Sequence, residues 1–248
     1  CNRFSGQGHF TYGAYGPWLE ERMFQMRHPW FCLLEKKERD FVRNADTAFC
    51  ACITDDYSFA CSQWWRCIES VLKRRLVEPI GRLIDENPQV VQSAVSDAPD
   101  RPKNHFGFVN LIDPNKRKHM SLSEILFILE AAMKDFKARR VSDCPVRRLA
   151  VEHLSTRMSE FRWVTGELDD VADFRSAITP RVFTPDTIKA FRNAASHDQP
   201  MTFIDAAIGR LIAIRILDYM HYPRYCVPAK LEELKQELQN NWPMDLHL

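Results

Sequence analysis

The stretch that decides the fold runs from Tyr57 to Asp85 and reads YSFACSQWWRCIESVLKRRLVEPIGRLID. Apolar side chains recur along it at intervals of three and four residues, and these are Cys61, Trp65, Ile68, Leu72 and Leu76. This spacing places them on one face, so the sequence predicts a long amphipathic helix with that face toward a core. Pro79 has no backbone N–H, and we expect it to kink the helix or to end its regular part.

Similar signals predict helices over most of the remaining chain. Ser121 and Glu124 form a capping box, which opens a helix to about Ala138. The other expected elements are a helix over 36–53, a loop over 87–104, a helix from Cys144 to about Phe174, a short helix over 184–196 and a helix from Pro200 to about Tyr219. The last of these is apolar on nearly every side, which predicts a central position. No alternating stretch predicts a sheet, so we expect an all-α bundle with elaborations.

The composition is that of an ordinary globular protein. The chain has 248 residues, of which 45% are hydrophobic and 27% charged, and its formal net charge is +1. This apolar content can build a core and excludes disorder over most of the chain. No apolar run approaches the roughly 20 residues that cross a bilayer, so we expect no membrane partner. The small net charge neither demands nor excludes nucleic acid, and only local patches bear on that question.

The chain divides into three expected regions. Residues 1–35 combine glycines with aromatic rings and predict an irregular segment, which we expect to continue from an upstream part because the chain begins with Cys1. Residues 36–222 form the predicted helical domain. Residues 223–248 predict a charged amphipathic tail, in which the apolar positions are Leu231, Leu234 and Leu238.

The eight cysteines favour structural roles. None forms a Cys-x-x-Cys pair, and no two histidines have zinc-finger spacing, so we expect neither a metal site nor a cofactor. Four cysteines gather in apolar helical segments, and these are Cys50, Cys52, Cys61 and Cys67. We interpret them as small buried thiols rather than as metal ligands. A chain of this length does not need disulfides, which favours a reducing, cytoplasmic location.

One short block combines residues that can carry chemistry. Phe191–His197 reads FRNAASH and lies between the short predicted helix and the apolar one. Arg192 is a permanent cation that can hold a phosphate with two hydrogen bonds, and His197 titrates near neutral pH. Such a pair is the minimum for cleaving RNA without metal: a base takes the proton of the ribose 2′-OH, and a cation offsets the charge on the phosphoryl oxygens.

A structural explanation of this block stays open. The same four-residue gap separates Arg148 from His153, so the spacing alone is weakly specific. At a helix C-terminus, a histidine can complement the helix dipole while an arginine forms a surface ion pair.

The block resembles the motif of the HEPN family, which is Arg-x(4 to 6)-His with a polar residue, here Asn193, directly after the arginine. The resemblance implies a dimerising helical bundle with metal-independent endoribonuclease activity, as in toxins and antiviral defence effectors. It implies that Arg192 and His197 are catalytic and that Asn193 orients the pair or bonds the phosphate. A minimal HEPN bundle is shorter, so residues 87–181 are expected to be a helical insertion.

A fourth site residue follows from the same resemblance. Trp65–Leu72 resembles the family's helix that carries an acidic residue within an apolar face, which makes Glu69 a candidate to fix Arg192 or His197. A solvated carboxylate at the edge of the stripe is the alternative. Some HEPN toxins carry a regulatory tyrosine two positions after the histidine, but this chain has Gln199 there.

Basic runs supply the candidate RNA contacts. Lys116, Arg117 and Lys118 precede the capping box at an expected loop, where they can grip RNA phosphates; a merely solvated loop is the alternative. We interpret Lys73-Arg74-Arg75 as a solvated helix face. Arg139-Arg140 and Arg147-Arg148 flank a helix junction and need no functional reason there.

The expected function is therefore a metal-independent HEPN endoribonuclease that cleaves RNA at a homodimer cleft, in a toxin or antiviral defence system. An antitoxin, a sensor partner or an upstream sensor domain would control it. The first alternative is a non-catalytic HEPN-like module that binds RNA or protein within a larger complex. The second is an unrelated helical interaction protein in which the motif occurs by chance.

Overall fold

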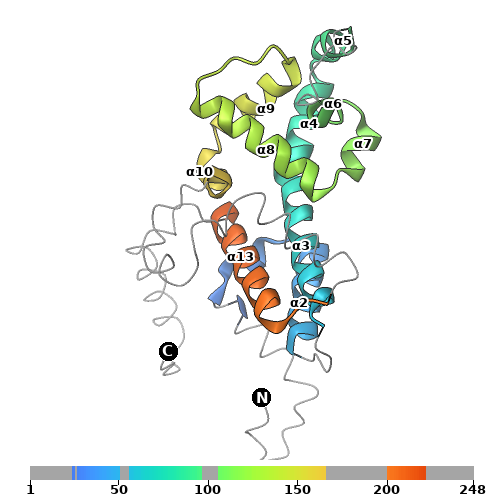
Figure 1. Ribbon diagram of the computed structural model, residues 1–248. Helices are drawn as coiled ribbons and strands as arrows, with labels where there is room; N and C mark the ends of the chain where they lie inside the picture. Colours follow the sequence, from blue (N-terminus) through green and yellow to red (C-terminus); the bar gives the residue numbers. More distant parts are fainter. Residues whose placement is uncertain (1–23, 26, 51–55, 97–105, 166–199, 222–248) are drawn as a thin grey trace, which may run out of the picture.

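The computed structural model describes residues 24–25, 27–50, 56–96, 106–165 and 200–221 (Figure 1). Every regular element in these ranges is helical and none is a strand, so the predicted all-α class is confirmed. The α-helices are α2 (Lys36–Cys50), α3 (Ser58–Leu72), α4 (Glu78–Asp85), α5 (Pro88–Ser96), α6 (Phe106–Val109), α7 (Pro114–His119), α8 (Leu122–Lys137), α9 (Pro145–Ser155), α10 (Met158–Phe161) and α13 (Phe203–His221). Shorter helical turns are η1 (Pro29–Leu33), η2 (Lys73–Val77) and η5 (Arg162–Thr165).

The stretch from Tyr57 to Asp85 forms one helical rod made of α3, η2 and α4 (Figure 1). The regular α-helix ends at Leu72, and η2 is a π-helical turn in which the Glu78 N–H donates to the Lys73 carbonyl. In an α-helix, residue 79 would donate to the carbonyl of Arg75, but Pro79 has no N–H. Widened π turns accommodate such a mismatch, so the chain stays helical on both sides of the proline.

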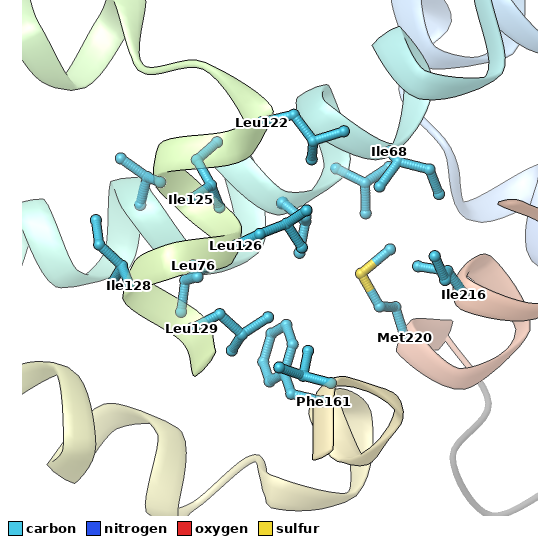
Figure 2. Close-up of a cluster of buried hydrophobic side chains, with 14 of the residues drawn as sticks. Ile68, Leu76, Leu122, Ile125, Leu126, Ile128, Leu129, Phe161, Ile216 and Met220 are labelled. Atoms are coloured by element: carbon cyan, nitrogen blue, oxygen red, sulfur yellow. The ribbon is translucent and has the colours of Figure 1, made fainter. Parts of the chain in front are cut away.

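The rod carries helices at both of its ends. At one end α2 and α13 pack on α3, with η1 against α13, and at the other end α9 packs on α4 and α8 (Figure 1). A buried cluster joins the two groups, and its residues include Ile68, Leu76, Leu122, Ile125, Leu126, Ile128, Leu129, Phe161, Ile216 and Met220 (Figure 2). Because burying one such side chain stabilises by about 1.5–3 kcal/mol, this shared core holds α3, α8, α10 and α13 together.

Helix α8 begins with the predicted capping box. The Ser121 hydroxyl accepts from the Glu124 N–H at 3.4 Å, and a Glu124 carboxylate oxygen accepts from the Ser121 N–H at 2.7 Å. The helix ends at Lys137, one residue before the predicted limit. Two free N–H groups at the helix start are satisfied locally, which explains why this start could be predicted.

The structure contradicts three predictions of secondary structure. Residues 87–104 were expected to be a loop, but Pro88 opens α5, since a proline is favourable in the first helical turn. The expected loop at 116–118 is the helix α7, which Asp113 caps by accepting from the N–H of Asn115. The expected helix from Cys144 is broken after Ser155, where α9 gives way to α10 and η5.

Helix α13 lies where the sequence predicted a helix, but its first residues are more exposed than predicted. Thr202 precedes it and accepts from the Asp205 N–H at 3.2 Å, which caps the helix start. Leu217 and Met220 are fully buried, but Phe203 and Ile204 are more than half exposed. The helix is therefore central along its C-terminal part and lies at the surface at its start.

The prediction that the clustered cysteines are buried is confirmed for two of them. Cys61 and Cys67 are buried in the core, and burial raises the pKa of Cys61 to about 11. Cys50 is exposed, which contradicts the prediction, and Cys52 lies outside the described residues. None of the helices described is both long and apolar enough to cross a membrane.

The capping box generates a test of the fold. Ser121→Ala should lower the free energy of unfolding by about 1 kcal/mol, because it removes an N-cap acceptor. Ser123→Ala in the same helical turn is the matched control, and it should change stability by less than about 0.5 kcal/mol. Urea unfolding followed by circular dichroism measures both, and equal losses in the two variants would contradict the capping role.

Candidate functional site

The predicted catalytic residues Arg192, Asn193 and His197 lie outside the described residues. The structure describes the chain again from Pro200, three residues after the motif. Glu69 and the basic residues 116–118, which were predicted to assist, lie inside it.

The segment that follows the motif is tied to the start of α3. The Tyr57 N–H donates to the Met201 carbonyl at 3.0 Å, and the Met201 N–H donates to a carboxylate oxygen of Asp56 at 3.1 Å. The Ser58 hydroxyl and N–H also donate to this carboxylate and lower the pKa of Asp56. Met201 itself is buried. The point where the chain enters α13 is therefore fixed beside the N-terminus of α3.

An aromatic group surrounds this anchor. The rings of Phe49, Tyr57 and Phe203 lie 5.1–5.5 Å apart, centre to centre. Arg210 lies over the Phe49 ring and makes two hydrogen bonds to the Asp46 carboxylate, at 2.9 and 3.2 Å. Because these contacts join α2, the start of α3 and α13, they hold the anchor in place a few residues after the motif in sequence.

Glu69 has structural partners in the described part of the chain. One carboxylate oxygen accepts from the Lys73 ammonium at 2.8 Å. The other accepts from the Leu122 N–H at 3.1 Å, which is a free donor in the first turn of α8. The second contact connects α3 to α8, and the first lies within the rod. The predicted role of Glu69 beside Arg192 or His197 stays a prediction, because both partners lie outside the described residues.

Not every side chain of the basic run Lys116–Lys118 is free to contact a phosphate. Arg117 makes two hydrogen bonds to the Asp85 carboxylate, at 2.7 and 2.9 Å, and its side chain is only 11% exposed. Its guanidinium lies so close to Gly81 that a Cβ there would overlap it. Lys116 and Lys118 are exposed. Arg117 thus attaches α7 to α4, and only the two lysines remain candidates for phosphate contact.

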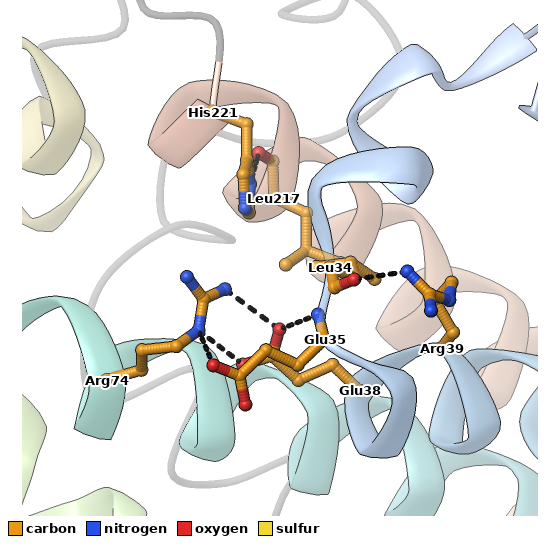
Figure 3. Close-up of polar contacts among 7 residues, drawn as sticks. All are labelled: Leu34, Glu35, Glu38, Arg39, Arg74, Leu217 and His221. Carbon is orange, nitrogen blue, oxygen red and sulfur yellow. Dashed lines mark hydrogen bonds and ion pairs between the residues drawn. The ribbon is translucent and has the colours of Figure 1, made fainter.

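The run Lys73-Arg74-Arg75 is not the solvated face that we expected. Arg74 makes hydrogen bonds to both carboxylate oxygens of Glu38, at 2.8 and 3.1 Å, and Glu38 is fully buried (Figure 3). The Arg75 guanidinium lies 3.0 Å from the Glu160 carboxylate. Because η2 turns these side chains toward different neighbours, three consecutive cations pair with three separate carboxylates.

The Arg75 carbonyl, to which residue 79 would donate in a regular α-helix, has a partner outside the rod. Arg157, in the break between α9 and α10, donates to it at 2.6 Å and also pairs with Glu160. A guanidinium has five donors in a fixed fork, so it can satisfy a carbonyl and a carboxylate together. Sequence reasoning missed this contact, although Pro79 is the signal that a carbonyl one turn earlier needs a donor.

From α13, His221 faces the ion pair between Arg74 and Glu38 (Figure 3). Its Nδ1 lies 2.9 Å from the Leu217 carbonyl, and its Nε2 is buried without a hydrogen-bond partner. Burial lowers the pKa of His221 to about 4, and the charges of Arg75 and Arg74 act in the same direction. The imidazole is therefore neutral at pH 7.

No family model, no curated protein and no solved structure matches this chain in the comparisons. Within the described ranges, no three histidine, cysteine, aspartate or glutamate side chains gather in a way that could hold a metal ion.

The buried ion pair generates a stability prediction. Arg74→Met should lower the free energy of unfolding by about 3 kcal/mol, because it leaves the Glu38 carboxylate buried without its cation. The exposed Arg66 lies on the same rod, and Arg66→Met should cost less than about 0.5 kcal/mol. Adding Glu38→Leu to Arg74→Met should recover most of the loss. Urea unfolding at pH 7 gives the three values, and similar losses at positions 66 and 74 would refute this role.

His221 generates a pH prediction. An unfolded histidine titrates near pH 6.5, so between pH 4 and 6.5 the unfolded chain binds more protons than the folded one, and stability falls as the pH falls. Acidification from pH 7 to pH 5 should cost about 2 kcal/mol through this residue. His221→Gln should lose that part of the pH dependence, whereas His119→Gln, at an exposed position, should keep it. Unfolding curves at the two pH values check this, and identical slopes in all three proteins would contradict it.

Proposed function

We propose that this chain is a metal-independent endoribonuclease of HEPN type, with Arg192 and His197 as its catalytic pair. One observation carries the proposal: the sequence FRNAASH ends three residues before Pro200, where the chain is anchored on α3 and enters the long helix α13. In the proposal, this anchor holds the nearby arginine and histidine in place for acid–base chemistry.

The proposed reaction uses these side chains as follows. Arg192 binds the scissile phosphate through two N–H groups, and Asn193 orients the pair or adds a hydrogen bond to the phosphate. His197 takes the proton of the ribose 2′-OH, whose oxygen attacks the adjacent phosphorus. The bond from phosphorus to the 5′-oxygen breaks, and the leaving oxygen takes a proton from a protonated histidine or from water. The products are a 2′,3′-cyclic phosphate and a 5′-hydroxyl.

The anchor limits where the proposed cleft can lie. His197 precedes Met201 by four residues, which reach at most about 14 Å. Glu69 follows Ser58 by eleven residues, which is about 16 Å of helix rise along α3. The proposal therefore places His197 toward the start of α3, and it assigns Glu69 the weaker role of fixing the helices on which the anchor rests.

A dimer is part of the proposal. Exposed apolar side chains gather near the anchor, where Phe59, Phe203 and Ile204 are 60%, 54% and 68% exposed. A second copy packed there would cover them and would bring two Arg–His pairs to one cleft. The small residues 194–196 permit such an approach. An inhibitor or sensor partner belongs to the same proposal as a source of control.

The second candidate is a non-catalytic helical module that binds RNA or protein. A specific observation favours it: Glu69 and Arg117, which were predicted to assist catalysis and RNA binding, are both engaged in contacts between helices. In this alternative Arg192 and His197 stabilise a helix end and have no substrate.

Cleavage of RNA in EDTA separates the two candidates. The full chain should cut single-stranded or structured RNA without divalent cations and leave a 2′,3′-cyclic phosphate or its hydrolysis product. Gel analysis and mass spectrometry of the fragments check this. Cleavage that requires Mg²⁺ or Mn²⁺ would refute the mechanism, and binding without cleavage would favour the second candidate.

Substitutions at the motif test the assignment. Arg192→Ala and His197→Ala should each abolish cleavage, and Arg192→Lys should lower it by at least about 100-fold, because lysine keeps the charge but loses the planar fork. Arg66→Ala removes an exposed arginine of α3 and is the matched control for activity. Circular dichroism confirms folding of each variant, and near-normal cleavage by Arg192→Ala or His197→Ala would show that the assignment is wrong.

A further inference from the structure

An open groove lies between α5, the end of α8 and α9. Its volume is about 490 Å³, and five of its eleven lining residues are aliphatic, namely Val90, Val141, Pro145, Leu149 and Val151. It lies at the end of the rod that carries α5 and α9, away from α2 and the anchor of α13 (Figure 1). The proposed ribonuclease site makes no use of this surface.

Unpaired arginines border the groove. Arg140 and Arg148 line it, and Arg139 is the chain neighbour of Arg140. In the described part of the chain, no hydrogen bond or ion pair involves these three guanidinium groups. Their neighbour Arg147 instead binds the buried Asp135 at 2.5 and 2.7 Å. Residues 134–148 contain six basic side chains and two acidic ones in a protein whose net charge is only +1.

The chemistry of this surface fits an acidic amphipathic helix. Such a helix places its apolar side chains on an aliphatic floor and its carboxylates beside the cations at the rim. Single-stranded RNA is the poorer fit, because bases stack on aromatic rings and Phe136 is the one aromatic residue of the lining.

We propose that the groove binds the C-terminal segment of the same chain, residues 229–248. This segment carries leucines at positions 231, 234 and 238, a spacing that forms one face of a helix. It contains four acidic and two basic side chains, so its charge is opposite to that of the rim. The leucines would pack on the aliphatic floor, and the carboxylates would form ion pairs with Arg140 and Arg148.

The chain connection is long enough for this docking. Helix α13 ends at His221, and Met220 lies beside Phe161 of α10 in the shared core (Figure 2). Ser155, which lines the groove, precedes Phe161 by six residues, a distance of at most about 20 Å. The nine residues 222–230 can span about 30 Å, so the segment can reach the groove from the end of α13.

Photo-cross-linking in the full chain tests the proposal. Val141 lines the groove and is 77% exposed, so p-benzoylphenylalanine can replace it without disturbing the core. At high dilution, mass spectrometry of the digested product should show cross-links mainly to residues 229–248 of the same molecule. The same photoreactive residue at the exposed Arg66 is the matched control and should not cross-link to that segment.

Charge reversal tests the rim. Arg140→Glu with Arg148→Glu should lower the yield of this cross-link about tenfold, since two exposed ion pairs become repulsive. Arg66→Glu with Lys118→Glu changes the net charge equally and should leave the yield unchanged. Adding Glu232→Arg and Glu233→Arg to the first pair should restore most of the yield. Leu234→Asp should lower it as the rim variants do, because it places a charge on the apolar floor.

Four results would overturn the proposal. The first is a set of cross-links to any segment other than 229–248, and the second is cross-links only between two molecules. The third is a yield at Val141 no higher than at Arg66. The fourth is that a 20-nucleotide single-stranded RNA displaces the segment and cross-links to Val141 itself, which would make the groove a nucleic-acid site.

Discussion

The ion pair between Glu38 and Arg74 is the contact on which the arrangement of helices depends. Glu38 is fully buried, so its carboxylate needs partners, and it has the Arg74 guanidinium and the Glu35 N–H at the start of α2. Once Arg74 is held there, the rotation of the rod about its axis is set. Glu69 then accepts from the Leu122 N–H of α8 and Arg75 meets Glu160 of α10, and these two contacts connect the rod to α8 and to α10.

The effect of Pro79 on the helical hydrogen bonds involves a residue that is distant in sequence, Arg157. In a regular α-helix residue 79 would donate to the Arg75 carbonyl, but Pro79 cannot, and Arg157 donates to this carbonyl from the break between α9 and α10. If α9 continued as a regular helix past Ser155, residue 157 would follow the helix path instead of the turn from which it reaches the rod. A missing N–H in one helix is thus compensated where another helix ends.

These internal pairs bear on function because they separate structural charges from available ones. Arg74, Arg75, Arg117 and Arg157 are all engaged with carboxylates. Charged groups that remain available to a ligand include those of the motif at 192–197, by sequence, the exposed Lys116 and Lys118, and the arginines around the groove of α8 and α9. The anchor that follows the motif in sequence and the groove lie at opposite ends of the rod (Figure 1). We therefore propose catalysis by the motif and docking of the C-terminal segment at the groove.

The sequence by itself determined the features that depend on neighbouring residues. The spacing from Cys61 to Leu76 predicted the rod, and Ser121 with Glu124 predicted the start of α8, because both signals act within a few helical turns. The FRNAASH block identified a candidate site in the same way, from adjacent residue types. Only the tertiary structure decided that Arg117 holds Asp85 and that Arg157 reaches the Arg75 carbonyl. Those contacts join residues 32 and 82 positions apart, and no local pattern records which distant charge a folded chain brings within hydrogen-bond distance.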